Sequence, residues 1–400
     1  MELFFNKLFS NIPVSKPTNQ PGQRSYSTGI RGGLQNDMFV KNAEPVFTGK
    51  RGSGSTKKGA VLKELDNITC PYSGVKMLSA KKIDKIEAEL AKTPSITGRI
   101  DILEQYKPNM QKLEKNMFAI FKGYAANHPE GNLNACLREL YPDSLAELKI
   151  EQIKVLDKVD KVTKKMDAKT ALEVRKITTD ARRKILSDTP ETIKRNPKAR
   201  TADHIFKRKD LLDELRDATI HKTNPELFDE MWQAASELPK SSTSMDAFIV
   251  KYADRPPVEI ATRLLRPSTT SIEHITPANP DSITTEAGEN ELTNFMPASR
   301  DWNTARGNNP LPEFIKQHRN IPRYSQKMTD DIIKAIYHGK MPDCDWYPYV
   351  LKEKMYNESQ GLINVNIDKY KVSEADAFKN APEKVIDAYN RLKEENKNIG

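Results

Sequence analysis

Cysteine and long apolar stretches are both scarce in this chain of 400 residues. Its three cysteines, Cys70, Cys136 and Cys344, are too few and too scattered for a disulfide framework or for a four-cysteine zinc site. No apolar run approaches the roughly 18–20 residues that are needed to cross a bilayer. The composition therefore excludes a disulfide-stabilised scaffold and a helical membrane protein, and it predicts a protein of a reducing compartment.

Acidic residues are outnumbered: 64 Lys and Arg stand against 55 Asp and Glu, which gives a net charge of +9. Residues 1–60 hold nine of the basic residues and three of the acidic ones, so this segment carries +6 of the excess. It is rich in Gly, Ser, Pro and Lys, and we predict a disordered basic tail. A basic chain attracts polyanions, but charge alone does not separate nucleic acid from a membrane surface or an acidic protein.

A helical pattern dominates residues 79–265. It is strongest between Ser144 and Leu186, where apolar residues recur every three to five positions. This stretch predicts a helical hairpin or a coiled-coil arm that could self-associate or bind a protein partner. Its Lys and Arg residues could follow a phosphate backbone, but a solvated helix face is the favoured interpretation. Further helices are expected at 206–219, 225–237, 244–263, 328–338 and 372–395, with the last two joined by the aromatic link "PDCDWYPYV".

Histidine is rare as well, with six residues in the chain, and His274 has an unusual setting. It lies in "SIEHITP", which we predict to be a strand, directly after Glu273. Two asparagines follow nine residues apart, Asn294 and Asn303, and "FMPASRDW" between them is expected to form the entry to a short helix. Arg306 and a glycine come next, which is a favourable helix end.

This pattern resembles the HNH endonuclease family, also called the ββα-metal fold. "SIEHITP" matches the family's acid–His strand, and "ELTNFMPASRDWNTARG" matches its loop and helix. Upstream, "TCPYSG" resembles the Cys-x-Tyr-Ser/Thr-Gly element at the first strand of the HNH domains of CRISPR effector nucleases. Zinc-bearing members carry cysteines five and eight residues after the first asparagine, where this chain has Ser299 and Trp302. The resemblance therefore implies no structural zinc.

The main departure from the family is a gap of nearly two hundred residues between the two matching parts, 66–78 and 269–316. The cost of closing a loop rises only logarithmically with its length, so we interpret the gap as a folded insertion whose ends meet. The alternative is that "CPYSG" matches by coincidence. The expected fold is mainly α with a small α+β part, an HNH module split by a helical insertion. The expected parts are a tail (1–60), the first strand or hairpin (61–78), the insertion (79–265), the ββα core (266–320) and a C-terminal helical region (321–400).

The resemblance implies metal-dependent hydrolysis of DNA phosphodiester bonds, with Mg²⁺ or Mn²⁺. His274 would be the general base, because a neutral imidazole can take a proton at pH 7. Glu273 and the side-chain carbonyl of Asn303 would be the metal ligands, and Asn294 would tie the loop and orient His274. Arg306 could contact the phosphate. Neighbouring residues on an ideal strand face opposite ways, so Glu273 and His274 can share a site only if the strand end twists.

The sequence leaves the biological setting open. The leading hypothesis is an endonuclease of phage or bacterial origin, with DNA as its partner and no membrane span. It would act in the cytoplasm of a bacterial host cell or in association with a virion. The alternatives are a non-enzymatic virion, scaffold or nucleic-acid-binding protein with a degenerate HNH module, and an antibacterial nuclease toxin. The sequence does not separate duplex DNA from single strands or RNA.

Overall fold

The computed structural model describes residues 59–187, 206–278, 287–341 and 343–399. The predicted basic tail therefore lies almost wholly outside the described residues. The described chain divides into two compact units. The hairpin unit takes residues 59–86, 108–111 and 265–399, and the helical unit takes residues 87–107 and 112–264. The helical unit lies within the predicted insertion, but it begins at Glu87 and leaves residues 108–111 to the hairpin unit.

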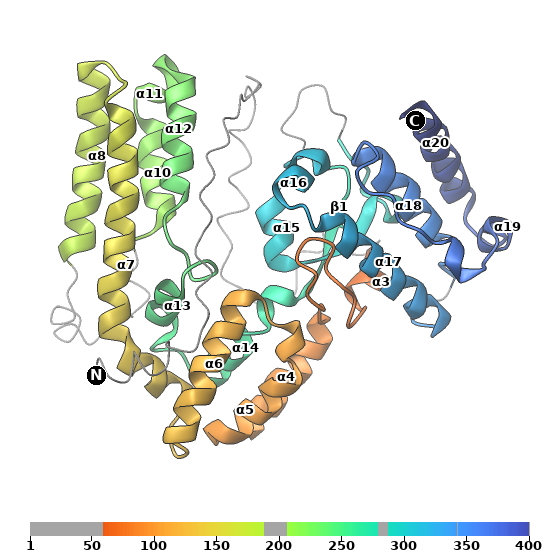
Figure 1. Ribbon diagram of the computed structural model, residues 1–400, viewed down its shortest axis with the longest axis horizontal. Coiled ribbons are helices and arrows are strands. Elements are labelled where there is room, and N and C mark those ends of the chain that lie inside the picture. The colour runs from red at the N-terminus through yellow and green to blue at the C-terminus, as the bar shows by residue number, and fades with distance from the viewer. Residues whose placement is uncertain (1–58, 188–205, 279–286, 342, 400) are drawn as a thin grey trace. The chain divides into compact units, whose positions relative to one another are not determined.

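The described residues are mainly helical, with one two-stranded sheet (Figure 1). In the hairpin unit the elements are α3 (Ala60–Lys63), η4 (Arg266–Ser268), β1 (Thr270–His274), η5 (Leu292–Asn294), β2 (Phe295–Ser299), α15 (Arg300–Arg306), α16 (Leu311–Gln317), α17 (Ile321–Tyr337), α18 (Tyr347–Glu358), η6 (Asp368–Tyr370), α19 (Glu374–Phe378) and α20 (Glu383–Ile399). In the helical unit they are α5 (Ile96–Gln105), α6 (Lys112–Asn127), α7 (Leu133–Thr163), α8 (Ala168–Ser187), α10 (Arg208–Asp217), α11 (Ile220–Thr223), α12 (Pro225–Ser236), α13 (Met245–Tyr252) and α14 (Pro257–Arg263). Helices α4 (Ala80–Lys92) and η2 (Lys107–Asn109) cross the boundary between the units.

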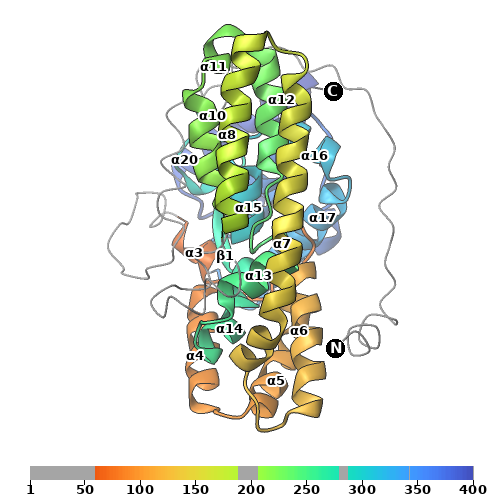
Figure 2. The same cartoon turned by 90° about the vertical axis from the view of Figure 1, so that its left-hand side faces the viewer.

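Helices α7 and α8 form the helical hairpin that the apolar pattern predicts, and they run side by side with α10 and α12 (Figure 2). Helix α7 begins at Asn132, whose side chain accepts a hydrogen bond from the Ala135 amide at 2.8 Å and so caps the first turn. Buried Leu156 and Val159 of α7 and Val174 of α8 share one apolar core with α10–α12. Burial of this shared stripe holds the bundle together.

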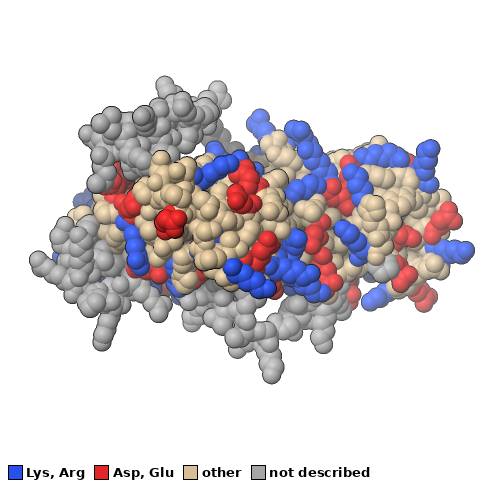
Figure 3. Space-filling view, turned by 90° about the horizontal axis from the view of Figure 1, so that it is seen from below, with Lys and Arg blue, Asp and Glu red and all other residues tan. Residues whose placement is uncertain are grey.

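Several basic residues on the α7–α8 hairpin are paired with carboxylates. Lys165 contacts Glu230 at 2.6 Å, and Arg182 contacts Asp160 at 2.6 Å. Arg183 and Lys184 also form ion pairs. On the face of the molecule seen in Figure 3, Lys and Arg side chains are likewise interspersed with Asp and Glu side chains. The ion pairs on the helical hairpin are those expected of a solvated helix face, and a phosphate contact there stays a prediction.

Strands β1 and β2 form an antiparallel pair in which Glu273 lies opposite Met296 and His274 lies opposite Phe295. Helix α15 follows β2 without a break, so residues 270–306 form a strand–strand–helix segment, here called the ββα segment. Every residue of β2 is buried, whereas β1 mixes buried and half-buried positions. Strand β2 is therefore covered on both of its faces, and β1 is covered only in part.

Residues 68–78 fold back on themselves and join the edge of β1. Thr69 pairs with Lys76 in an antiparallel bridge, and the Cys70 amide donates to the Val75 carbonyl at 2.8 Å. Leu78 then forms a parallel bridge with Thr269, just before β1. The apolar residues of this upstream hairpin lie in the same core as β1, β2 and α16–α18. Segments almost two hundred residues apart in the sequence thus share one folded unit.

Two local predictions are wrong. "FMPAS", predicted to be a helix entry, is strand β2, and the aromatic link "PDCDWYPYV" instead leads directly into helix α18. Strand β2 has no polar–apolar alternation because both of its faces are buried, and Pro297 argued against a strand. In α18 the proline lies in the first helical turn, where its missing N–H group costs no hydrogen bond. Within the described residues, no helix is long and apolar enough to span a membrane.

Gly74 should tolerate substitution worse than the other glycines with positive φ. Its φ is +71°, and an added Cβ would lie 2.6 Å from the ring of Tyr324. Gly339 has a similar φ of +67° with nothing within 4 Å. We expect Gly339→Ala to lose about 1 kcal/mol of unfolding free energy from backbone strain alone. Gly74→Ala should lose roughly 2–3 kcal/mol, because the ring must also move. Urea unfolding measures both, and equal losses would contradict the predicted clash.

Candidate functional site

In the ββα segment, the side chain of Asn303 on α15 contacts strand β1, the strand that ends at His274. His274 is the last residue of β1, and Asn303 lies on the second turn of α15. The Asn303 side-chain amide donates to the Ile272 carbonyl at 2.7 Å and to the Ser271 hydroxyl at 3.1 Å. No hydrogen bond from another described residue reaches its Oδ1 atom. Asn303 is half-buried, so its amide nitrogen is anchored on β1 and its oxygen is left to accept from, or ligate, something else.

His274 is half-exposed at the end of β1, and its ring packs edge-on against Phe295 with the centroids 4.8 Å apart. Its Nε2 atom lies 3.3 Å from the side-chain oxygen of Asn290. Burial lowers the pKa of His274 below its ordinary value, the hydrogen bond to Asn290 opposes this, and the nearby charge of Arg306 lowers the pKa further. The imidazole is therefore mainly neutral at pH 7, which is the form a general base requires.

Glu273 points the opposite way from His274 and is only 3% exposed. Its Oε1 atom accepts a short hydrogen bond from the Arg306 guanidinium, and its Oε2 atom has no partner among the described residues. Burial raises the pKa of Glu273 to about 7, although Arg306 and hydrogen bonding by Tyr72 both lower it. The strand end thus follows the ordinary alternation, and Glu273 is drawn inward by an ion pair that the sequence pattern does not predict.

The guanidinium of Arg306 is fully buried below the end of β1. Besides Glu273, it donates to the His274 carbonyl at 2.8 Å and to the Ile275 carbonyl at 2.9 Å, and its Nε atom donates to the Asn309 carbonyl at 3.1 Å. These bonds fix the backbone where the chain leaves the sheet. Arg306 closes α15 before Gly307, as predicted, but its side chain faces the strand rather than the surface. Contact with a phosphate remains a prediction.

Glu273 should make the stability of the protein fall with rising pH. Its pKa of about 7 in the folded chain lies above the ordinary 4.5, so the folded state holds the proton more tightly than the unfolded state does. The contribution is complete below pH 4.5 and is lost as the pH rises to 7. We expect wild type to lose about 2–3 kcal/mol more than Glu273→Gln between pH 4.5 and 8. Parallel urea titrations test this, and parallel curves for the two proteins would contradict it.

Asn294 ties together the two ends of the loop between β1 and β2, as predicted. Its Oδ1 atom accepts from the Thr276 amide at 2.8 Å, and its Nδ2 atom donates to the Thr276 carbonyl at 3.0 Å and to the Glu289 carbonyl at 2.9 Å. Gly288 fits against this clamp, because a Cβ there would lie 2.0 Å from the Thr276 carbonyl oxygen. The side chain of Asn294 bonds the loop backbone, and the contact with the imidazole of His274 comes from Asn290 instead.

Replacing Asn294 with alanine should destabilise the hairpin unit by about 1–3 kcal/mol, because a buried donor and a buried acceptor of Thr276 lose their partner. Asn294→Asp keeps an acceptor for the Thr276 amide but places a carboxylate beside two carbonyl oxygens, so it should cost at least as much. Urea unfolding with tryptophan fluorescence measures the loss. A stability within 0.5 kcal/mol of wild type, roughly that of a neutral surface change, would show that the loop is not held by this side chain.

The positions where zinc-bearing HNH proteins carry cysteines have other contacts in this chain. The Cys70 thiol lies 3.3 Å from the Ser299 hydroxyl, and the Ser299 amide donates to the Cys70 sulfur at 3.4 Å. Trp302 packs its ring edge-on against His318, with the centroids 5.1 Å apart. The described residues contain no group of three or more His, Cys, Asp and Glu side chains that could hold a metal. The contacts of Cys70 with Ser299 join the upstream hairpin to β2.

The donor chemistry of the predicted magnesium site fits a hard cation. Glu273 offers Oε2, a buried carboxylate oxygen with no partner, and Asn303 offers an amide oxygen whose nitrogen is anchored. Mg²⁺ prefers oxygen ligands and commonly takes one or two from the protein, with water and phosphate supplying the rest. Because β1 keeps the ordinary alternation, with Glu273 buried and His274 half-exposed, Glu273 could join His274 at a cation only if the end of the strand twisted on binding. Both metal-ligand assignments remain predictions.

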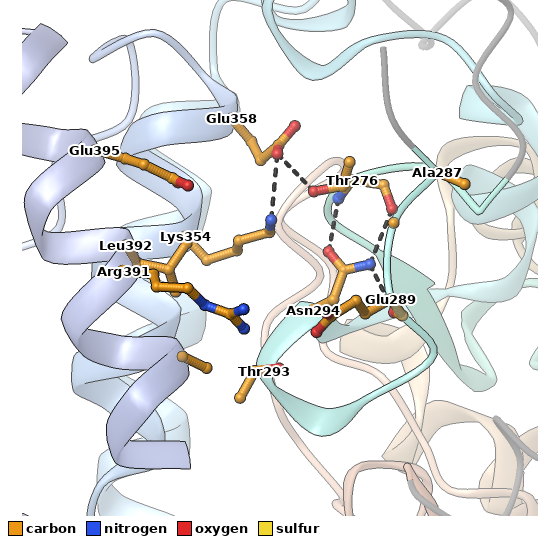
Figure 4. A pocket seen from close by; sticks show the side chains of 12 residues that line it. Thr276, Ala287, Glu289, Thr293, Asn294, Lys354, Glu358, Arg391, Leu392 and Glu395 are labelled. Carbon is orange, nitrogen blue, oxygen red and sulfur yellow. Dashed lines mark hydrogen bonds and ion pairs between the residues drawn. The ribbon is translucent and has the colours of Figure 1, made fainter. Parts of the chain in front are cut away.

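A pocket of about 330 Å³ lies between the loop that Asn294 ties together and helices α18 and α20 (Figure 4). Thr276 contributes its hydroxyl, which donates to Glu358 of α18, and Lys354 pairs with the same carboxylate at 3.3 Å. The Arg391 guanidinium of α20 points into the pocket (Figure 4). These contacts brace the loop from the C-terminal helices, so the position of the clamp depends on α18 and α20.

Two residues that contact the candidate site were not singled out from the sequence. Asn290 lies in the polar loop, where nothing distinguishes it from its neighbours, and a structure is needed to find it. Tyr72 lies in the "CPYSG" element, which the sequence did single out. The spacing of residues does not predict that Tyr72 contacts Arg306. Its hydroxyl accepts a hydrogen bond from Arg306 at 3.2 Å.

Comparison of the chain with protein-family models, with curated proteins and with solved structures finds no match.

Proposed function

We propose that the protein is a metal-dependent endonuclease of the HNH type that hydrolyses phosphodiester bonds in DNA. The observation that carries the proposal is the ββα segment itself. A half-exposed histidine ends the first strand, and an asparagine from the following helix hydrogen-bonds that same strand with its amide nitrogen. Among the residues that the resemblance singles out, this geometry supports His274 and Asn303.

In this proposal His274 takes a proton from the attacking water. Its lowered pKa keeps the ring neutral at pH 7, and packing against Phe295 limits its rotation. Asn290 holds one ring nitrogen, which leaves the other to act on water. Asn294 keeps the loop closed, so the base stays at a fixed place beside the end of β1.

Glu273 and Asn303 are the proposed ligands of the divalent cation. When bound, Mg²⁺ or Mn²⁺ would act as a Lewis acid that stabilises the developing charge on the phosphate. The side chains of the protein position that chemistry: Asn303 is anchored on β1 through its nitrogen, and the positive charge of Arg306 partly opposes the rise that burial causes in the pKa of Glu273. The DNA strand would have to lie across the end of β1, where His274 reaches the surface.

One observation favours a second candidate, a nucleic-acid-binding or scaffold protein with a degenerate HNH module. Glu273 is buried and paired with Arg306, so both side chains are engaged with each other rather than with solvent. If that pair persists when DNA and metal are present, the segment keeps the HNH shape without its activity. The two candidates predict opposite results in one assay.

The test incubates the purified full chain with supercoiled plasmid in Mg²⁺ or Mn²⁺, with parallel reactions in EDTA. We expect conversion to the nicked circle that requires metal and stops with the chelator. A folded protein that shifts the plasmid in a gel but does not cut it with either metal would overturn the nuclease proposal and support the binding candidate. Single-stranded DNA and RNA substrates in the same conditions define the substrate class.

A further inference from the structure

Tyr72 enters the ββα segment from far upstream in the sequence. Its side chain is only 2% exposed, and its ring meets Phe314 edge-on with the centroids 5.2 Å apart. The ring therefore has a packing role that any aromatic residue could fill. The hydroxyl does something else, because it accepts a hydrogen bond from Nη1 of Arg306 at 3.2 Å.

The hairpin that carries Tyr72 is pinned on both sides. Thr69 donates to Asp331 of α17 through its amide at 2.9 Å and through its hydroxyl at 2.6 Å, and Cys70 contacts Ser299 of β2. After Tyr72 the turn closes at Gly74, whose positive φ and contact with Tyr324 exclude a side chain. With both neighbours fixed, the hydroxyl of Tyr72 is held at one place relative to β2 and α17.

Arg306 links the Tyr72 hydroxyl to the strand that carries His274. The two hydrogens of Nη1 are shared among three acceptors, Glu273 Oε1, the His274 carbonyl at 2.8 Å and, at the longest distance of 3.2 Å, the Tyr72 hydroxyl, while Nη2 donates to the Ile275 carbonyl. These two carbonyls lie where the chain leaves β1. A guanidinium that tilts would therefore move the backbone of His274, and the Tyr72 hydroxyl is one of the groups that set its orientation.

We propose that Tyr72 is a positioning residue of the proposed nuclease site: its hydroxyl orients the Arg306 guanidinium, which fixes the end of β1 and so aims His274. The inference rests on the proposed function for its effect on catalysis, but the effect on His274 does not depend on activity. It also gives the upstream hairpin a role in the reaction, because residues nearly two hundred positions away hold the base in place.

The hydroxyl can be removed without removing the ring. Tyr72→Phe keeps the contact with Phe314, and Nη1 of Arg306 keeps Glu273 and the His274 carbonyl as acceptors, so the chain should fold. Small errors in the placement of a catalytic group reduce the rate strongly, by up to about 100-fold for 1 Å. We expect Tyr72→Phe to lower kcat about 10-fold with KM within about 2-fold, because DNA contacts do not change.

Tyr124→Phe is the matched control. Tyr124 is also a largely buried tyrosine whose hydroxyl bonds a charged side chain, Glu139 at 3.0 Å, but it lies in the helical unit. Its ring stacks on His128 at 4.3 Å. In ¹H–¹³C spectra of histidine-labelled protein, Tyr72→Phe should shift the ring signal of His274, and Tyr124→Phe should shift that of His128 instead. The signals of His274 and His128, two of the six, are assigned as those missing from the His274→Ala and His128→Ala spectra.

The two measurements separate the possible failures. Wild type that does not cut DNA overturns the proposed function, and the His274 signal then decides the positioning role alone. A His274 signal in Tyr72→Phe that matches wild type overturns that role whether or not the protein is a nuclease. If wild type cuts, kcat within about 2-fold of wild type in Tyr72→Phe also overturns it. A purely structural tyrosine would lower the melting temperature and leave both kcat and the His274 signal unchanged.

Discussion

His274→Ala should cut supercoiled plasmid about 10²–10⁴-fold more slowly than wild type, which is the usual contribution of a positioned general base. The expectation follows from three features of the residue: it ends β1, it is half-exposed, and its lowered pKa keeps it neutral near pH 7. The ring packs against Phe295 at the edge of the core, so its loss should cost little stability. Initial rates of nicking at saturating Mg²⁺ measure the effect.

The control is His338→Ala. His338 is exposed at the end of α17, and its substitution changes the same residue type in the same unit. It should nick at the wild-type rate. Equal activity of His274→Ala and wild type, with both proteins folded, would remove His274 from the reaction and would leave any observed nicking to another group or to a contaminant.

Strand β1 and helix α15 could be predicted from the sequence because their signals are local. The strand within "SIEHITP", an asparagine on a short helix, and a helix that closes at Arg306 and Gly307 each depend on a few neighbouring residues. The α7–α8 hairpin was predictable for a similar reason, since a long apolar periodicity reflects one buried face. These elements would be recognised in almost any tertiary setting.

The sequence could not predict which way a side chain points or which faces of a strand are buried. Spacing predicts that Arg306 follows Asn303 by one helical turn, but it does not say that the side chain reaches beneath β1 to Glu273. The prediction of a phosphate contact assumed an outward-facing arginine. Strand β2 was missed because burial on both faces removes the alternation that marks a half-buried strand. In both cases the missing information is which distant segments pack against the residue or the strand.

The contact of Tyr72 with Arg306 could not be predicted either. The "CPYSG" element was recognised, yet spacing left it open whether it met the His274 strand or matched by coincidence. The contacts of Cys70 with Ser299 and of Tyr72 with Arg306 join the two segments in the described structure. A contact across nearly two hundred residues depends on how the intervening helices return the chain, which no local pattern encodes.

Arg306→Met should lower the unfolding free energy of the hairpin unit by about 3–5 kcal/mol, the range for removing one partner of a buried ion pair. Glu273 must then either keep its charge in a buried site or take up a proton, and the carbonyls of His274 and Ile275 lose a donor. Urea unfolding at pH 8, where Glu273 is mainly ionised in wild type, measures the loss. Arg306→Lys keeps the charge, but a lysine cannot reach several acceptors at once. Its unfolding free energy should therefore lie between those of wild type and Arg306→Met.

The size of this loss separates the ion pair from the carbonyl contacts. Adding Glu273→Gln to Arg306→Met removes the stranded carboxylate, so the double variant should be more stable than Arg306→Met alone, although still less stable than wild type. Arg263→Met is the matched control, because Arg263 pairs with buried Glu114 at 2.9 Å in the helical unit. It should destabilise the chain without moving the ring signal of His274, whereas Arg306→Met should do both. A double variant no more stable than Arg306→Met would mean that the carbonyls at the end of β1, rather than Glu273, are what Arg306 chiefly holds.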